Sequence, residues 1–134
     1  MWTYKGKEVN DEDVEGYQAF VYIIENLETG RKYIGKKNLF FTRSKKVKGK
    51  TRRKRERKVS DWRDYWGSSR SLLDDVADLG EDKFRREILH FCKTKGTANY
   101  LEMKEQIINE VLENDCWYND QIRVRVHRSH LKNM

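Results

Sequence analysis

The chain has 134 residues, and its 29 Lys and Arg exceed its 22 Asp and Glu, which gives a net charge of +7. This length fits one domain with a modest core, and the basic excess is typical of a protein that binds a polyanion. No apolar run approaches membrane-spanning length and no signal-peptide pattern begins the chain, which argues against a membrane or secreted protein. The two cysteines, Cys92 and Cys116, have no paired spacing, so we expect free thiols and a cytoplasmic protein.

The positive charge is not spread evenly, because the N-terminal part is rich in acid and the basic excess begins at Arg31. Residues 1–16 are polar and predict a loosely held N-terminal arm. Strands are expected at about 18–25 and 31–36. Between them lies a turn whose Gly30 can adopt the left-handed conformation. The first part of the domain is therefore expected to be a β-hairpin.

Two tyrosines stand out in this hairpin. Tyr22 ends the apolar run Phe20-Val21-Tyr22, and Tyr33 opens Tyr33-Ile34-Gly35 eleven residues later. A four-residue loop over 27–30 would place both phenols on one face as diagonal neighbours, whereas a three-residue loop would place them on opposite faces. The sequence leaves both arrangements open. An ordinary amphipathic hairpin with aromatic packing also explains the pair, because tyrosine is a good strand former.

The next segments are predicted as a helix, a loop and two more helices. Residues 37–44 are expected to form a short helix with 39–41 on its buried face. Residues 45–58 are almost wholly basic and polar, which is typical of a solvated loop. A helix is expected to begin at 60–61 and to carry aromatic residues at helical spacing. After Gly67, a serine caps a further helix that Gly80 ends; the candidates are Ser68 and Ser69.

The C-terminal third predicts a strand at 84–91, a long helix that Thr97 caps and that runs to about Glu113, and an edge strand from Gln121 with one basic face. The element order is then β-β-α-α-β-α-β. It predicts an α+β domain with a small mixed, mainly antiparallel sheet flanked by helices. The division of the chain is expected to be a polar arm at 1–16, one domain at 17–120 with a basic insertion at 45–58, and a basic strand or tail at 121–134.

One carboxylate on the long helix is expected at an unusual place. At 100° per residue, Leu101, Ile108 and Leu112 form an apolar stripe, and Glu105 lies at its edge. Glu102 falls on the polar side. A carboxylate at the margin of a buried face needs a cation or hydrogen-bond donors. Either a bound metal ion or a salt bridge satisfies this need; the candidate basic partners are Lys104, Arg85 and Arg86.

These motifs resemble the GIY-YIG nuclease superfamily, whose signature is a first triplet ending in tyrosine and a second that reads Tyr-Ile-Gly. The second triplet is complete at 33–35, and the first keeps Tyr22. A downstream segment is similar to one in small phage endonucleases of the Seg type, and it reads Trp62-Arg63-Asp64-Tyr65-Trp66-Gly67-Ser68-Ser69. The resemblance covers about residues 17–120. It implies a phage-encoded endonuclease of the host cytoplasm that uses Mg²⁺ (or Mn²⁺) to cut double-stranded DNA as a monomer or weak homodimer.

The resemblance also implies roles for single residues. Glu105 is expected to be the one protein ligand of the divalent cation, and Asn119 follows it at the interval that the family keeps. One carboxylate without a histidine cluster suits a hydrated Mg²⁺ ion better than Zn²⁺. Arg43, eight residues beyond the glycine of the second triplet, would stabilise the charge on phosphorus in the transition state. Arg52 and Arg53 are the alternatives for this arginine.

The implied reaction is hydrolysis of a phosphodiester that leaves 5′-phosphate and 3′-hydroxyl ends. Tyr22 would deprotonate the attacking water, directly or through a neighbour, and Tyr33 would hydrogen-bond the phosphate or the nucleophile. A free phenol titrates near ~10, so Lys36, Lys37 or the cation must favour its anion. Many relatives carry histidines at two places that hold other residues here, Val47 and Gly67. Tyr22, Lys36 or Lys37 must then act as the general acid or base in place of a histidine.

The basic run is predicted to grip DNA, because eight or more phosphate contacts would dominate the affinity and make it steeply dependent on salt. Its candidate contact residues are Lys45, Lys46, Lys48, Lys50, Arg52, Arg53, Lys54, Arg55, Arg57 and Lys58. Trp62 is a candidate for stacking on bases, and Ser68 and Ser69 are further candidates for DNA contact. A merely solvated loop is the alternative.

Two other functions explain the charge. One is a catalytically inactive basic nucleic-acid-binding module on the same scaffold, and the other is an RNA- or ribosome-associated basic protein. Nicking of supercoiled plasmid in Mg²⁺ and not in EDTA distinguishes an enzyme from both. The histidines and cysteines are scattered with irregular spacing, which does not favour a zinc site.

Overall fold

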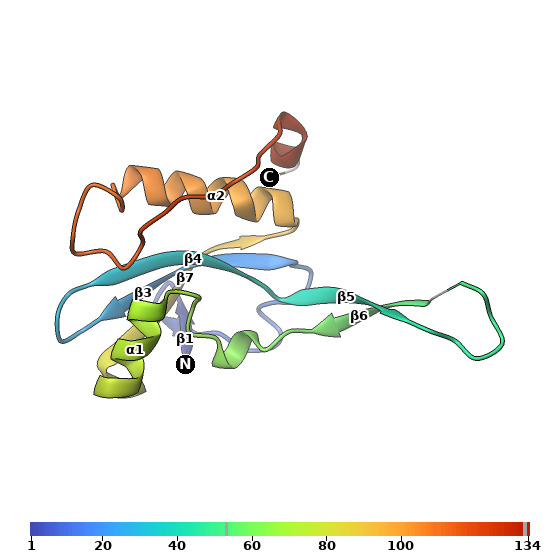
Figure 1. The fold of residues 1–134 in the computed structure, drawn as a ribbon, viewed down its shortest axis with the longest axis horizontal. Coiled ribbons are helices and arrows are strands. Elements are labelled where there is room, and N and C mark those ends of the chain that lie inside the picture. Colours follow the sequence, from blue (N-terminus) through green and yellow to red (C-terminus); the bar gives the residue numbers. More distant parts are fainter. Residues whose placement is uncertain (53, 133) are drawn as a thin grey trace.

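The computed structural model describes residues 1–52, 54–132 and 134, and of residues 45 and 54 it describes the main chain alone. A mixed sheet with the order β2-β1-β7-β3-β4 forms the centre (Figure 1). Its strands are β1 (Trp2–Tyr4), β2 (Lys7–Glu8), β3 (Ala19–Asn26), β4 (Lys32–Asn38) and β7 (Phe84–Cys92). A separate two-stranded sheet consists of β5 (Phe40–Lys45) and β6 (Lys54–Val59). The two α-helices are α1 (Arg70–Leu79) and α2 (Lys95–Ile108), and short 3₁₀ turns occur at Trp62–Asp64, Glu81–Lys83 and Arg128–Leu131.

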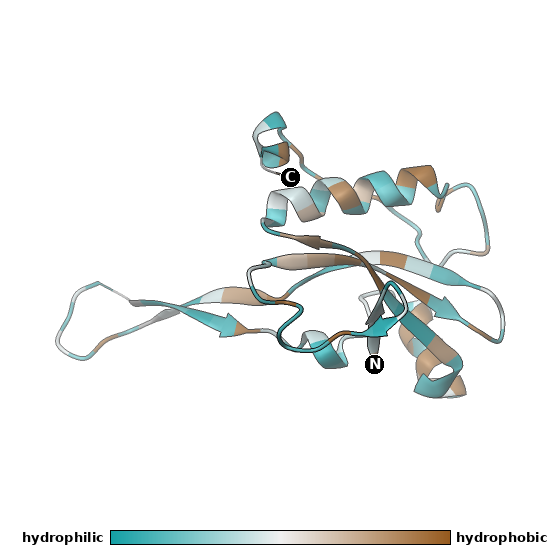
Figure 2. Ribbon diagram, turned by 180° about the vertical axis from the view of Figure 1, so that it is seen from behind, coloured by the Kyte–Doolittle hydropathy of each residue, from teal (hydrophilic) through white to brown (hydrophobic). Residues whose placement is uncertain are grey.

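This arrangement confirms the α+β class and a mixed sheet flanked by helices, but the order of the elements differs from the predicted one. Neither helix in the described part of the chain is long and apolar enough to cross a membrane. The inner strand β3, between β7 and β4, is covered on both faces, which explains why its sequence is apolar without alternation (Figure 2). Phe20 and Tyr22 pack on the side of α1 with Trp62, whereas Val21 packs on the side of α2 with Ala98.

The predicted hairpin of Tyr22 and Tyr33 is confirmed as β3 and β4. The Gly30 amide donates to the carbonyl of Asn26 at 2.8 Å, and the φ of Gly30 is 79°, which closes the four-residue loop. The helix after the Ser-Ser pair is confirmed as α1, because the Ser69 hydroxyl accepts from the amide of Leu72 and Gly80 is the C-cap. The strand predicted at 84–91 is confirmed as β7.

The polar N-terminal segment is not a loose arm. β1 pairs in parallel with β7, and β2 pairs with β1 at the edge of the same sheet. Trp2 is 3% exposed, and its Nε1 donates to the carbonyl of Trp62 at 2.7 Å. Three buried apolar residues, Trp2, Val9 and Val14, therefore anchor this segment to the core, and its polar composition alone predicted the wrong structure.

The helix predicted at 37–44 is wrong, and the loop predicted at 45–58 is confirmed only over 46–52, because its two ends belong to strands. β4 continues to Asn38, and after Leu39 the chain enters β5, which pairs with β6 from Phe40–Val59 to Lys45–Lys54. Aromatic and β-branched residues at the start of β5 favour a strand. Leu39 is buried but Phe41 is exposed, so the expected apolar face is only partly buried. The β5–β6 arm, as we call residues 40–59, projects from the body of the domain (Figure 1).

Three expectations for the later elements also change. The helix predicted over 60–66 is reduced to a 3₁₀ turn at Trp62–Asp64. α2 begins earlier than predicted, because the side chain of Thr94 and not that of Thr97 caps it, and it ends at Ile108 and not near 113. Residues 121–127 have no regular secondary structure, so the predicted edge strand of the tail is wrong.

Trp2→Ala should lower the free energy of unfolding by about 3–5 kcal/mol, because it removes a buried indole and its hydrogen bond. The ring lies 5.0 Å from that of Phe20 and 5.2 Å from that of Tyr22. Denaturant unfolding measures the change, and Leu27→Ala, at a residue that is 58% exposed, is the control. A loss for Trp2→Ala no larger than that of the control would mean that the segment is loosely held after all.

Candidate active site

The two tyrosines lie on one face of the sheet as diagonal neighbours. The register pairs Tyr22 with Gly35 and Tyr33 with Ile24, and the centroids of the two phenol rings are 6.2 Å apart. This is the arrangement that a four-residue loop predicts, and it excludes the three-residue alternative. β4 is the edge strand of the sheet, so Tyr33 stands at the border between the covered face and solvent.

Two glycines make room for the Tyr22 phenol. A Cβ on Gly35 would lie 2.5 Å from the Tyr22 hydroxyl and 2.9 Å from Cε1 of Tyr33. A Cβ on Gly67 would lie 3.3 Å from the same two atoms, and the φ of Gly67 is 89°, which other residues rarely adopt. The glycine of the second triplet and the glycine before the Ser-Ser pair are therefore needed for the same contact. The sequence predicts Gly67 only as the break between the helix that begins at 60–61 and the helix that follows.

Tyr22 is a buried, neutral phenol. Burial raises its pKa well above 10, with further increases from Tyr65 and Tyr33. The two candidate lysines have other partners: the Lys37 ammonium is 2.6 Å from Asp61 and 4.2 Å from the centroid of the Tyr65 ring, and the Lys36 charge acts on Glu102. The prediction that these lysines favour the anion of Tyr22 thus gains no support. A phenol of this kind is suited to donate a hydrogen bond and not to remove a proton from water.

Tyr33 faces an open cleft of about 330 Å³ at the β4 edge. Its hydroxyl is 3.1 Å from the Ser68 hydroxyl. Burial raises the pKa of Tyr33, although the bond to Ser68 acts in the opposite direction. The cleft is lined by Tyr33 of β4, residues 68–71 at the start of α1, Glu102 and Gln106 of α2, residues 118–121, and Arg123. The cleft thus joins side chains from both faces of the sheet at its edge.

Glu102 and Asp120 both line this cleft, and Glu102 is its carboxylate from α2, although the helical pattern placed Glu102 on the polar side. Burial raises the pKa of Glu102 to about 6, against the opposing effects of the Lys36 charge and the Lys36 main chain. Glu105 points elsewhere, with Oε1 2.9 Å from Nε2 of His90 on β7. The structure therefore does not bring Glu105 together with the tyrosines.

The apolar pattern misled the helix prediction because the expected stripe is largely outside the core. Ile108 is 63% exposed and Leu112 is 50% exposed, whereas Gln106 is 6% exposed. The Gln106 amide is buried because its Nε2 donates to the carbonyl of Ile34 at 3.0 Å. A polar side chain with a main-chain partner thus replaces an apolar one in the buried face of α2.

Asn119 lies at the cleft, and its contacts explain its place. The Ile34 amide donates to Oδ1 of Asn119 at 3.0 Å, and Nδ2 of Asn119 donates to the Ile34 carbonyl at 2.8 Å. Just before it, the Tyr118 amide donates to the carbonyl of Lys32 at 2.7 Å. Asn119 therefore satisfies the outer edge of β4 in the way that a neighbouring strand would, and it fixes the strand that carries Tyr33.

The arginines of the cleft are not the predicted ones. Arg43 lies on β5, opposite Glu56 in the register, and Arg52 lies in the turn of the arm. Arg53 lies outside the described residues. The cleft is lined instead by Arg70 and by Arg123. Arg70 is the first residue of α1, so its position follows directly from the Ser-Ser cap that the sequence predicts.

A third arginine, Arg86, fixes the segment that leads to the cleft, which no pattern in the sequence indicates. Its guanidinium lies 4.1 Å from the ring of Trp66 and 4.7 Å from that of Trp2. It also donates to the carbonyls of Arg63 and Tyr65, at 3.1 and 2.8 Å. Arg86 therefore holds the main chain just before Gly67 and the Ser-Ser pair.

The predicted DNA-contact residues fall in two places. Ser68 and Ser69 line the cleft, whereas the basic candidates occupy the arm, where the side chains of 45 and 54 are outside the described part of the structure. Trp62 is buried in the core. Burial of its ring gives no support to the prediction that Trp62 stacks on bases.

The residues of the cleft fit a largely hydrated divalent cation. No group of three or more His, Cys, Asp or Glu that could enclose an ion occurs among residues 1–52, 54–132 and 134. Glu102 is a single desolvated carboxylate, and the cleft also has the side chains of Asp120 and Gln121. An oxygen donor set with room for water suits Mg²⁺ or Mn²⁺ and not the closed coordination of a structural zinc ion.

Comparison with known proteins gives one match. The family model described as "Putative endonuclease segE, GIY-YIG domain" matches residues 2–122. Neither the curated proteins nor the solved structures include a match to the chain. The matched region contains β1, both tyrosines, the arm, Glu102 and Asn119, so it includes the whole cleft except Arg123.

Glu102→Gln should stabilise the protein at pH 8 and not at pH 4. Burial raises the pKa of Glu102 from 4.5 to about 6, so the folded state binds this proton more tightly, and its stability falls as the pH rises through that interval. A shift of this size corresponds to at most about 2 kcal/mol. Thermal unfolding at both pH values measures the difference, with Glu113→Gln, at an exposed site, as the control. An equal effect of Glu102→Gln at both pH values would contradict the burial of this carboxylate.

Proposed function

The chain belongs to the SegE-type GIY-YIG endonuclease family, and we propose that it hydrolyses phosphodiester bonds of double-stranded DNA with one divalent cation, Mg²⁺ or Mn²⁺. The products would carry 5′-phosphate and 3′-hydroxyl ends. The observation that carries the proposal is the meeting of a desolvated carboxylate and a phenol, Glu102 and Tyr33, in one open cleft at the β4 edge. Nicking of supercoiled plasmid in Mg²⁺, compared with EDTA, tests it.

Glu102 takes the role of metal ligand that the resemblance implies for Glu105. It is the carboxylate that α2 contributes to the cleft, and its raised pKa reflects burial that a nearby cation would offset. A divalent cation held there would stabilise the negative charge on the oxygen that leaves phosphorus. Glu105 is instead a structural partner of His90, away from the cleft.

Tyr33, and not Tyr22, contacts the reacting groups. Its hydroxyl and that of Ser68 both face the cleft and can donate hydrogen bonds to a phosphate oxygen or to the attacking water. Tyr22 lies behind it and acts as a positioning residue, because its ring packs against Tyr33 and the two glycines. With both phenols neutral near pH 7, deprotonation of water is not assisted by a tyrosinate, so we expect the rate to rise with pH above neutrality.

The phosphate would be received at the amino end of α1. Ser69 caps this helix, and free main-chain amides at a helix start attract anions. Arg70, at the same place, replaces Arg43 as the guanidinium that neutralises the transition state. Its side chain is 90% exposed, and its Nε is 3.4 Å from Asp74, so it is able to turn towards a bound phosphate.

A binding module without catalysis is the second candidate. The observation in its favour is the buried, neutral Tyr22, which lacks the activating neighbours that a general base needs. Such a module would bind DNA but would leave supercoiled plasmid intact in Mg²⁺.

Glu102→Gln should abolish cleavage in Mg²⁺, because it removes the anionic ligand and keeps the size of the side chain. Glu105→Gln is the matched control on the same helix, and it should cut within a factor of a few of wild type. A second measurement does not need activity: Mg²⁺ should raise the melting temperature of wild type and Glu105→Gln but not that of Glu102→Gln. The opposite pattern for the two glutamates would restore Glu105 as the ligand.

Tyr33→Phe should slow single-turnover cleavage by about two to four orders of magnitude, which is the usual scale for a lost proton-transfer or phosphate-orienting group. Tyr22→Phe should slow it far less, because the buried hydroxyl does not face the cleft. Rates are compared at saturating DNA, with thermal unfolding to confirm that both variants fold. A larger loss for Tyr22→Phe than for Tyr33→Phe would contradict the exchange of roles.

A further inference from the structure

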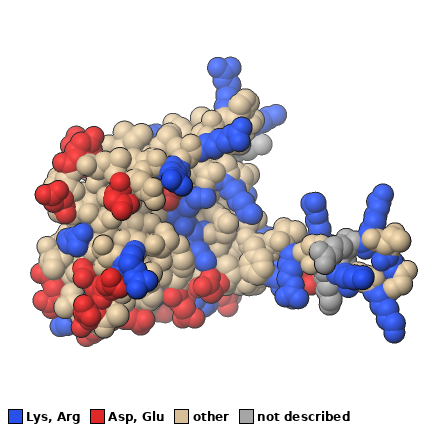
Figure 3. All heavy atoms as spheres, in the orientation of Figure 1, with Lys and Arg blue, Asp and Glu red and all other residues tan. Residues whose placement is uncertain are grey.

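The positive charge of the protein is concentrated in the β5–β6 arm. Residues 41–58 contain eleven of the 29 Lys and Arg but one of the 22 Asp and Glu. The rest of the chain therefore has a net charge of −3, although the whole chain has +7. The space-filling view shows basic side chains along the arm, and acidic ones mainly at the left and lower margins of the body, where some basic side chains also lie (Figure 3). The arm is therefore the largest concentration of positive charge along the chain, and residues 121–134, with four Lys and Arg and no Asp or Glu, are a smaller one.

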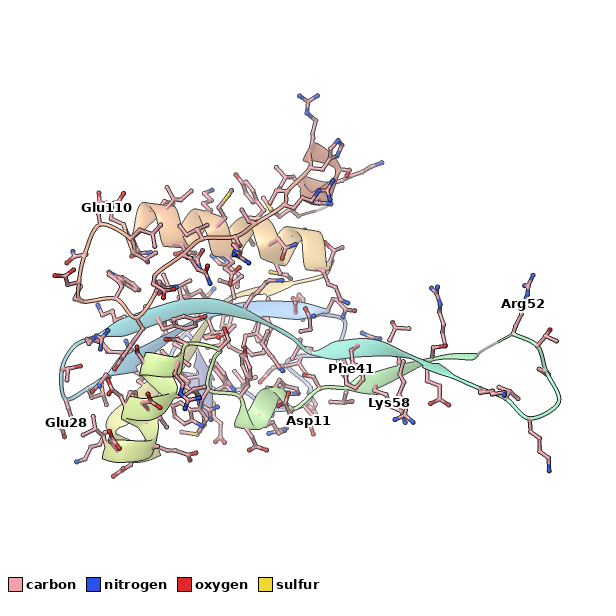
Figure 4. All side chains as sticks on the ribbon, in the orientation of Figure 1. Asp11, Glu28, Phe41, Arg52, Lys58 and Glu110 are labelled. Atoms are coloured by element: carbon pink, nitrogen blue, oxygen red, sulfur yellow. The ribbon has the colours of Figure 1, made fainter. Side chains whose placement is uncertain are left out.

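Basic side chains occupy both faces of the ribbon. Successive residues of a strand point to opposite faces, and the register aligns Thr42 with Arg57 and Ser44 with Arg55. The other face carries Arg43, opposite Glu56, and Lys58, opposite Phe41. Figure 4 shows Lys58 and Phe41 nearer the base and Arg52 near the tip. A ribbon that lay flat on DNA would need cations on one face only, whereas a ribbon between two phosphate backbones needs them on both.

The base of the arm is fixed to the catalytic body. The Ser60 hydroxyl donates to the carbonyl of Asn38 at 2.6 Å, and Nε2 of Gln18 donates to the carbonyl of Phe40 at 2.8 Å. Leu39, between β4 and β5, is fully buried. β5 thus continues directly from the edge strand that carries Tyr33, and β6 leads back towards the Ser68-Ser69 segment. The position of the arm relative to the cleft is set by these two connections.

We propose that the β5–β6 arm is a β-ribbon that enters the major groove of double-stranded DNA, an inference that rests on the proposed function in that DNA is the substrate. The major groove of B-DNA is about 12 Å wide and admits a two-stranded ribbon, and its walls are the two phosphate backbones. Strands of six residues extend about 20 Å, which is long enough for the ribbon to lie in the groove over part of a turn. Arginines on both faces then reach a backbone on each side.

Groove binding also explains the unusual make-up of the arm. An isolated two-stranded ribbon is marginally stable, and this one has little apolar surface beyond its base. Like charges along it repel one another, so neutralisation by phosphates stabilises the ribbon as it binds. The short side chains of Thr42 and Ser44 leave room beside Arg57 and Arg55 for close approach of this face to a phosphate backbone.

The decisive experiment measures DNA binding in EDTA, so that it does not depend on cleavage. Arg55→Ser with Arg57→Ser removes two cations from one face, and Arg43→Ser with Lys58→Ser removes two from the other. Each pair should lower the affinity at least about tenfold and reduce the slope of log K against log salt by about two. Lys93→Ser with Lys104→Ser removes the same charge from exposed sites on the body. This control pair should change the affinity and the salt slope much less than either arm pair does.

Wild-type protein gives an independent readout of the groove. Methylation of guanine N7, in the major groove, should interfere with binding, and netropsin in the minor groove should not compete. An RNA duplex of the same sequence should bind more weakly, because the A-form major groove is too narrow for side chains to enter. An effect of only one face of the ribbon, interference only from the minor groove, or equal binding of the RNA duplex would overturn groove insertion.

Failure of groove insertion and failure of the proposed function are distinguishable. Plasmid nicking by wild type, with unchanged DNA affinity in both arm variants, would overturn the role of the arm and leave the nuclease intact. Binding through both faces without nicking in Mg²⁺ would support the ribbon and reject the enzyme.

Discussion

The site depends on the hydrogen bonds that satisfy the main-chain groups at the open edge of β4. An edge strand presents main-chain groups with no partner strand, and here the end of the domain supplies the partners: Tyr118 to Lys32, and Asn119 with Gln106 to Ile34. Because these bonds draw α2 and residues 118–121 to the edge, Glu102 reaches it from one face of the sheet. Tyr33 reaches it from the other face. The cleft is the consequence of closing one strand edge with side-chain amides.

A second constraint separates affinity from chemistry. The body that holds the cleft is acidic overall, whereas the arm is strongly basic. A nuclease needs a local cation at the scissile phosphate, but long-range attraction can come from a separate element, which is fixed here at its base and extends away from the core. Acidic surroundings are compatible with a divalent metal in the cleft, and the basic arm offsets the repulsion that the body exerts on DNA.

Local patterns predicted those parts of the fold that local physics determines. The turn around Gly30 predicted the hairpin, but the loop length, and with it the face of Tyr33 relative to Tyr22, was open until the register was known. The Ser69 cap and Gly80 delimited α1. The helical pattern placed Glu102 on the polar side, whereas it lines the cleft. The reason is that Gln106, a polar residue, is buried by a bond to Ile34 in a distant strand, and no helical pattern contains that partner. Arg43 was expected on a helix after Gly35, but it lies on the strand β5 and does not line the cleft.

The central claim is that Glu102, not Glu105, shares the cleft with Tyr33 and binds the cation. Paramagnetic broadening of main-chain amide signals by substoichiometric Mn²⁺ tests this directly. If Glu102 binds the cation, the amides of Lys36, Ser68 and Asn119 should broaden first, because these residues surround or adjoin the cleft. Early broadening at His90, with those cleft signals unchanged, would contradict the claim and place the cation on Glu105.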